Sequence, residues 1–420
     1  MSLQTRAALL AVTALMAAAC GSGSDDAAKP QRRTVQVDYK HDEFATSLFD
    51  YFPRRIEVRQ GDTVEFKQAW AGEPHSVTMG TLVDDNIEPV LRLLTEIERT
   101  GMVPEDEPEE FEVFGEAVPY AFAREGLAQN AAQPCYVDAE GFDGTYPGDE
   151  KTPCPNRAQP EFTGRQAIYN SGIIPYEGVQ GNTFSMKVAD DATPGTYTYY
   201  CNFHGPLQWG QVEVKQKGAE IPAAGEVARQ ARKEAERKVA PLLHNWKEAL
   251  AGRPVTAGDP GQTRRVETRG KNLVGVPAEF FVDNTFIFGI VNEFVPRDLS
   301  AKVGEKVTWT FGGGHTLSFN VPEYFPVFST APDGTVSFNK EAEEPQGWPA
   351  PPDPPGVNGG EPPERVPAHV DAGAWDGSGF RSSGLAFDDD DTLSVTFTRA
   401  GTYPFACLIH PQMIGQLVVR

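Results

Sequence analysis

The chain has 420 residues, which at the usual domain size corresponds to two or three domains. Its 59 acidic and 37 basic residues give a formal net charge of −22, which excludes the basic face of a nucleic-acid-binding protein. Aromatic residues make up 10% of the chain, which excludes disorder throughout, and the 5 Cys and 7 His mark where metal or redox chemistry could lie.

The first twenty residues have the pattern of an export signal. Arg6 precedes an apolar run from Ala7 to Ala19, which is too short to span a bilayer. The run ends at Cys20, and small residues directly before a cysteine resemble a bacterial lipoprotein signal, in which that cysteine becomes the lipidated N-terminus; the alternative is an ordinary signal peptide. We therefore expect a signal peptide over 1–20, a flexible tether over 21–33, and an extracytoplasmic protein that a lipid anchors to the bacterial cell membrane, on its periplasmic or cell-surface side.

The next segment predicts strands around a histidine. Residues 53–80 read as a strand, a glycine turn, a second strand with alternating Val64 and Phe66, a glycine-containing loop, and His75 leading into a third strand.

An insertion, about 81–165, follows this strand. Apolar residues at helical spacing predict a helix over Asn86–Thr100. Cys135 and Cys154 then lie in an irregular stretch with no other Cys or His near in sequence, which disfavours a metal site. We expect a disulfide there, worth about 3 kcal/mol on the chain-entropy model; the alternative is two free thiols.

Two similar segments surround the remaining cysteines. GTYTYYCNFHGPLQWGQVEV, residues 195–214, contains Cys201 and His204, and GTYPFACLIHPQMIGQLVV, residues 401–419, contains Cys407 and His410. Each has Gly-Thr-Tyr, Cys-x-x-His and Gly-Gln before an alternating strand.

The repeat continues upstream of these segments. Asn-Ser-Gly-Ile at 170–173 matches Ser-Ser-Gly-Leu at 382–385, and residues 296–321 repeat the strand, turn, strand and His pattern with His315. Such a repeat predicts two copies of one domain, over 34–217 and 266–420.

A connector over 218–265 separates the copies. Val239, Leu242, Leu243, Trp246 and Leu250 form an apolar stripe that predicts a helix over Ala219–Ala251, which Pro241 either kinks or divides. The second copy has its own insertion, about 322–381, whose Pro and Gly content predicts little regular structure.

Each copy thus supplies two imidazoles and one thiolate, the donor set of a blue type 1 copper site. On these motifs the copies resemble cupredoxins, the family of plastocyanin, azurin and amicyanin. The resemblance implies an all-β fold: two Greek-key β-sandwiches with insertions, joined by an α-helical connector. It also implies two copper ions as cofactors, with each His of Cys-x-x-His at an exposed edge that passes electrons.

The resemblance also implies the ligands of each site. They are His75, Cys201 and His204 at the first site, and His315, Cys407, His410 and Met413 at the second.

Two residues are candidates for the axial position of the first site, depending on how the two copies are aligned. Met413 lies two residues before Gly415, and counting back equally from Gly210 gives Gln208, a ligand type found in the stellacyanin-like branch. Counting three residues from the histidine gives Leu207, which cannot ligate. Axial Gln would lower the reduction potential of this site below that of the other, whereas Leu would raise it above.

The remaining histidines argue against an enzyme. Only His41, His244 and His369 are left, and the chain has no H-x-H pair for a multicopper oxidase and no C-x-x-x-C for a binuclear copper centre. We expect no catalytic residues. We expect instead that the protein transfers single electrons between redox proteins. Because both domains are acidic, partners with a basic face would be attracted to them. The alternatives are a lipoprotein that stores or delivers copper and an extracellular interaction protein.

Overall fold

The computed structural model describes most of the chain. The described residues are 29–68, 75–101, 161–166, 169–171, 174, 183–201, 204–258, 263–283, 285–322, 328–330, 336–349, 368–386 and 389–420. Cys20, Cys135 and Cys154 lie outside them, and with them the expected lipid anchor and disulfide. No helix in this part of the chain is long and apolar enough to cross a membrane.

Two sheets in the N-terminal half enclose one core. A four-stranded sheet has the order β3-β1-β5-β8, and a five-stranded sheet has the order β4-β10-β9-β6-β7. Burial alternates along β1, β5 and β8, and Val35, Phe66 and Val212 share a core. The bounds are β1 (Arg32–Val37), β3 (Tyr51–Phe52), β4 (Arg55–Arg59), β5 (Thr63–Gln68), β6 (Thr78–Met79), β7 (Tyr169–Asn170), β8 (Thr183–Lys187), β9 (Gly195–Cys201) and β10 (Gly205–Lys215).

The C-terminal half repeats this arrangement. A six-stranded sheet has the order β2-β16-β13-β18-β24-β22, and a five-stranded sheet has the order β17-β26-β25-β19-β23. Trp309 lies in their common core with Phe397 and Phe405. The bounds are β2 (Thr46–Leu48), β13 (Asn272–Val276), β16 (Gly289–Val295), β17 (Asp298–Ala301), β18 (Lys306–Phe311), β19 (Ser318–Phe319), β22 (His369–Trp375), β23 (Arg381–Ser382), β24 (Thr392–Phe397), β25 (Gly401–Ala406) and β26 (Ile414–Val419).

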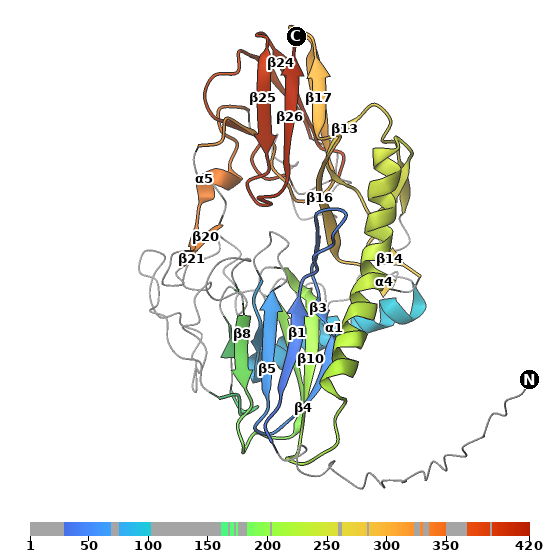
Figure 1. Ribbon diagram of the computed structural model, residues 1–420, viewed down its shortest axis with the longest axis vertical. Coiled ribbons are helices and arrows are strands. Elements are labelled where there is room, and N and C mark those ends of the chain that lie inside the picture. The colour runs from blue at the N-terminus through green and yellow to red at the C-terminus, as the bar shows by residue number, and fades with distance from the viewer. Residues whose placement is uncertain are drawn as a thin grey trace, which may run out of the picture.

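One strand crosses between the halves. β2 belongs by sequence to the N-terminal copy, yet it pairs antiparallel with β16, with Ser47 opposite Ile290. Figure 1 shows this segment as a blue hairpin that rises from the lower body to the edge of the upper one. A strand from the N-terminal half therefore completes a sheet of the C-terminal half.

A long helix lies in the segment 218–265, with ends that differ from the expected Ala219–Ala251. α4 (Ala224–Leu250) runs without interruption through Pro241 and lies beside both halves (Figure 1). Val239 and Leu242 are buried in a cluster with Phe52 and Val291, which come from the two halves. Leu250 is 53% exposed, so the predicted apolar stripe ends before it. The connector is not wholly helical, because β11 (Val255–Ala257) and β12 (Arg264–Val266) form a hairpin after α4.

The two insertions differ in how well they were predicted. The helix in the first is confirmed as α1 (Thr81–Thr100), which begins five residues earlier than expected and packs on Tyr200 and Trp209. The expectation of little regular structure in 322–381 is wrong in part, because β22 pairs in parallel with β24 at the edge of the sheet. The same insertion contains β20 (Phe328–Thr330), β21 (Val336–Phe338) and α5 (Lys340–Glu343), and a further hairpin joins β14 (Phe281–Val282) to β15 (Thr285–Phe286).

Candidate metal centres

The first candidate centre lies at one end of the N-terminal sheets. His75 precedes β6, Cys201 ends β9, and His204 lies in the turn between β9 and β10. Their potential ligand atoms all lie within 4.8 Å of one another. The Sγ atom of Cys201 is 3.5 Å from Nδ1 of His204. The strand-and-turn geometry thus brings together three residues that span more than a hundred positions.

The second centre has the same construction in the C-terminal sheets. The ligand atoms of His315, Cys407 and His410 also lie within 4.8 Å of one another. Nδ1 of His315 is 3.1 Å from Nδ1 of His410, which is 3.4 Å from the Sγ atom of Cys407. Met413 is fully buried, and its carbonyl accepts a hydrogen bond from the Cys407 amide at 3.0 Å. This bond closes the loop that carries Cys407, His410 and Met413.

The hydrogen bonds around the two thiols repeat as well. The amides of Ser76 and Thr316 each donate to the facing Sγ atom at 3.4 Å. One residue later, the amides of Val77 and Leu317 donate to the hydroxyls of Ser171 and Ser383. These serines belong to the repeated Asn-Ser-Gly-Ile and Ser-Ser-Gly-Leu motifs, which thus support the histidine strand from the neighbouring segment.

The electrostatics of both centres favour thiolates. Burial alone would raise the pKa of Cys201, but His204 and His75 lower it well below its usual value. Cys407 behaves in the same way beside His410 and His315. Burial lowers the pKa of His75, but Asp38 and Cys201 raise it to about 10. Because metal ligands must be deprotonated, each buried thiolate and its imidazoles fit a soft cation that displaces a proton.

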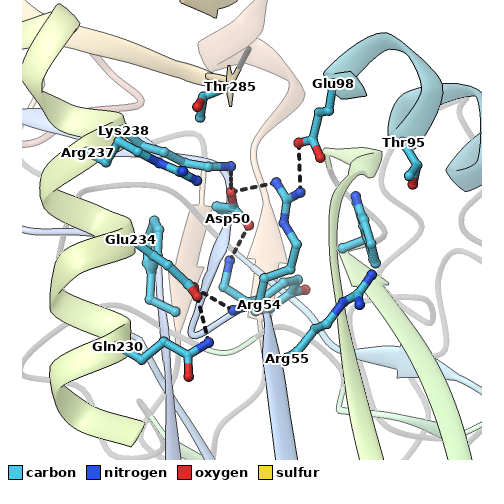
Figure 2. A pocket seen from close by; sticks show the side chains of 13 residues that line it. Asp50, Arg54, Arg55, Thr95, Glu98, Gln230, Glu234, Arg237, Lys238 and Thr285 are labelled. Atoms are coloured by element: carbon cyan, nitrogen blue, oxygen red, sulfur yellow. Dashed lines mark hydrogen bonds and ion pairs between the residues drawn. The ribbon is translucent and has the colours of Figure 1, made fainter. Parts of the chain in front are cut away.

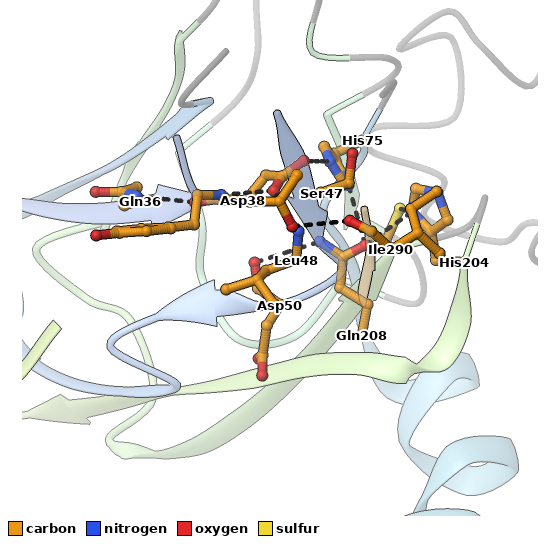
Figure 3. A network of polar contacts seen from close by, with 12 residues as sticks. Gln36, Asp38, Ser47, Leu48, Asp50, His75, His204, Gln208 and Ile290 are labelled. Atoms are coloured by element: carbon orange, nitrogen blue, oxygen red, sulfur yellow. Dashed lines mark hydrogen bonds and ion pairs between the residues drawn. The ribbon is translucent and has the colours of Figure 1, made fainter. Parts of the chain in front are cut away.

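Gln208 lies beside both histidines of the first candidate centre. Its Oε1 atom lies 3.0 Å from Nδ1 of His75 and 2.9 Å from Nδ1 of His204 (Figure 3). Its Nε2 atom donates to the Asp50 carbonyl at 3.4 Å, so the oxygen is turned towards the histidines. Leu207 instead packs on the α1 cluster with Trp209. Of the two counts left open by the sequence, this geometry favours Gln208.

The backbone at Asp50, which orients Gln208 from between β2 and β3, is held by a cluster of charged side chains. The Asp50 carboxylate contacts Lys238 of α4 and lies 3.2 Å from Nη2 of Arg54. Burial opposes its ionisation, but Arg54 and Lys238 lower the pKa of Asp50 below its usual value. Glu98 of α1 lies 2.8 Å from Arg54, and these residues line a cavity of about 280 Å³ (Figure 2). Through Lys238, α4 thus holds Asp50, whose carbonyl orients Gln208 at the first centre. The sequence did not predict this contact.

The histidines after the cysteines are less exposed than the resemblance implied. His410 is fully buried, so the expectation of an exposed edge is wrong there. The segment 40–46 from the N-terminal half lies near it, because it shares a small cavity with Gln412. His204 is half-buried and stacks on Phe49, which also contacts Phe288 from the C-terminal half at 4.7 Å between ring centroids. The residue that covers His204 thus directly follows β2, the strand that pairs with the C-terminal half.

Sequence reasoning also missed Asp38. Its Oδ2 atom lies 2.9 Å from Nε2 of His75, and both side chains are fully buried (Figure 3). Asp38 lies outside the repeated motifs, and nothing in its sequence context marks it. Among the described residues, the two His-Cys-His groups do not include His41, His244 or His369.

The comparisons with known proteins add little. No family model and no curated protein matches the chain. Among solved structures, a copper(I) form of an amicyanin mutant is 19% identical and covers 30% of this chain and 73% of its own, with a TM-score of 0.16. Amicyanin from Paracoccus versutus is 16% identical and covers 36% of this chain and 82% of its own, with a TM-score of 0.17. Such low scores place no constraint on function, so any inference about function has to come from the chain's own residues.

Proposed function

We propose that this protein binds copper at two type 1 sites and transfers single electrons between extracytoplasmic redox proteins. The observation that carries the proposal is the buried cysteine with two facing imidazoles, which occurs twice with the same hydrogen bonds. Thiolate and imidazole together select copper with a trigonal ligand set and a weak axial group. Bound copper would supply one-electron chemistry between its cuprous and cupric states.

The residues of each site have distinct roles in this proposal. His75, Cys201 and His204, with Gln208 as axial ligand, hold the first ion, and His315, Cys407 and His410, with Met413, hold the second. Because these side chains lie in paired strands or in the loops that adjoin them and are mostly buried, their positions should change little between oxidation states. A fixed ligand set is what an electron carrier needs.

The architecture proposed with this function has two cupredoxin domains. We assign residues 34–217 and 266–420 to two Greek-key sandwiches and 218–265 to the connector. The two sheet pairs with separate cores and the repeated ligand positions support this assignment. The proposed lipid anchor at Cys20 rests on the sequence pattern alone. The net charge of −22 favours redox partners with a basic face.

Purified full-length protein loaded with copper tests the function. We expect two copper ions per chain and an intense blue colour that ascorbate bleaches and ferricyanide restores. A colourless protein that binds cuprous ion and yields it to a chelator would instead indicate copper storage or delivery. Cys201→Ser and Cys407→Ser should each remove one ion and its share of the colour.

A further inference from the structure

We propose that Asp38 is a positioning residue for His75 and that it makes the two metal sites unequal, because the second site has a glycine in its place. The inference rests on the proposed function and deepens it. It concerns how residues around the first site make it bind cupric ion in preference to cuprous ion.

The equivalence of Asp38 and Gly275 follows from strand register. β1 runs parallel to β5 with Val37 opposite Gln68, and β13 runs parallel to β18 with Val274 opposite Phe311. Gln68 and Phe311 each lie seven residues after the turn glycine of the repeat, Gly61 or Gly304. The residues after Val37 and Val274 are therefore equivalent. Both have left-handed backbones, with φ of 63° at Asp38 and 79° at Gly275.

The Asp38 carboxylate holds the far side of the His75 ring. Nε2 of His75 donates to Oδ2 of Asp38, which directs Nδ1 towards Cys201 and Gln208. The other oxygen of Asp38 accepts from the amides of Leu48 at 2.7 Å and Tyr39 at 2.5 Å. The carboxylate is therefore fixed by the backbone, and the ring cannot turn without breaking its bond to Asp38.

The second site excludes such a carboxylate. A Cβ atom at Gly275 would lie 2.3 Å from Nε2 of His315 and 2.4 Å from the Gly312 carbonyl oxygen. The His315 ring therefore lies directly against the backbone, and any side chain at 275 would displace it. The difference between the sites is built into these two positions.

A buried carboxylate on a ligand imidazole has two effects on a bound cation. It increases the electron donation of the imidazole, and its negative charge favours the higher cation charge in a site shielded from water. Asp38 should therefore strengthen cupric more than cuprous binding. Gln208 acts in the same direction as an oxygen donor, but through the axial position.

The test uses the full chain with Cys407→Ser, so that only the first site is loaded. In this background Asp38→Asn should weaken cupric binding by about 10–100-fold and cuprous binding clearly less, which raises the reduction potential. The cupric EPR spectrum should change as well. A merely structural role would weaken both ions equally and leave the potential unchanged, and that result would overturn the proposal.

Two further variants complete the design. Asp38→Gly copies the second site and is compatible with the left-handed backbone. It should also raise the reduction potential, and it serves as the test if Asp38→Asn does not fold. Asp62→Asn is the matched control, because Asp62 is also buried and accepts from the amides of Arg59 and Gln31 away from both centres. It should leave the potential unchanged.

A second probe separates this inference from the proposed function. If the parent chain binds no copper, the proposed function fails, and the affinity for Zn²⁺ is measured instead. A loss of about 10–100-fold in Zn²⁺ affinity on Asp38→Asn would still support Asp38 as the positioning residue. Equal Zn²⁺ affinity in parent and variant, or equal copper potentials where copper binds, would refute it.

Discussion

The ring of Phe49 stacks on His204, with the ring centroids 4.2 Å apart and the planes inclined by 22°. Phe49 directly follows β2, and its amide donates to the Phe288 carbonyl at 2.8 Å. The residue that covers the first centre is therefore fixed by the contact between the two halves. Access to this centre and the joining of the halves depend on the same short segment.

This arrangement predicts that Phe49 limits the reaction of the first site with reductants in solution. In the Cys407→Ser background, Phe49→Ala removes the ring over His204 and should increase the rate of reduction by ascorbate several-fold. Stopped-flow absorbance measures this rate. Phe280→Ala is the control, since its ring contacts Phe288 and not His204. Equal rates for parent and Phe49→Ala would show that ascorbate reaches the site elsewhere.

The axial residues predict the order of the two potentials. The first site, observed in Cys407→Ser, should have a lower potential than the second, observed in Cys201→Ser, because the amide oxygen of Gln208 stabilises cupric ion better than a thioether does. Exchanging the ligand types tests the cause. Gln208→Met should raise the first potential and Met413→Gln should lower the second. Redox titration in which the first site lies above the second would contradict this assignment.

The connector helix should contribute strongly to stability through one side chain. Leu242 is fully buried between the halves, so Leu242→Ala should lower the free energy of unfolding by about 2–5 kcal/mol. Leu250→Ala changes the same residue type on the same helix at a 53% exposed position and should have little effect. Urea unfolding followed by circular dichroism compares them. Similar midpoints for the two variants would mean that α4 does not support the fold as described.

The ion pairs of Asp50 with Lys238 and Arg54 should stabilise the folded protein by an amount that depends on pH. Removing Lys238 leaves the Asp50 carboxylate with one fewer cation, and Lys238→Met should cost about 3–5 kcal/mol. Because the pKa of Asp50 is lowered on folding, its ionisation stabilises the protein at pH values above the usual carboxyl pKa. This stability is lost as the pH falls through the lowered pKa.

Asp50→Asn tests the pH dependence. It should destabilise the protein most near neutral pH, and the difference from the parent should shrink in acid. Urea unfolding at a series of pH values measures this difference. A difference that is constant with pH would contradict the inferred ionisation of Asp50.

The sequence predicted the parts of the centres that lie in repeated motifs. Cys201 and His204 are close in the chain, and the second copy confirmed their pattern with Cys407 and His410. The count from Gly210 also led to Gln208. In contrast, Asp38 and Phe49 act through contacts between distant segments, which leave no periodicity or spacing in the sequence.

In the fold as well, the elements with a local sequence pattern were predicted, and those that depend on pairing with distant strands were not. The helices α1 and α4 follow from apolar spacing, so only their ends differ from the prediction. β2 has three residues and pairs with a strand more than two hundred positions away, so no local pattern predicts it. β22 lies in an insertion whose Pro and Gly content suggests irregular structure, and only its pairing with β24 makes it a strand.

Copper titration of the purified parent protein beside Cys201→Ser and Cys407→Ser tests the central claim most directly. The blue absorbance of the parent should rise to an end point at two copper ions per chain, and that of each variant should end at one. A parent that stays colourless, or variants that retain the full colour, would contradict two cysteine-ligated type 1 sites.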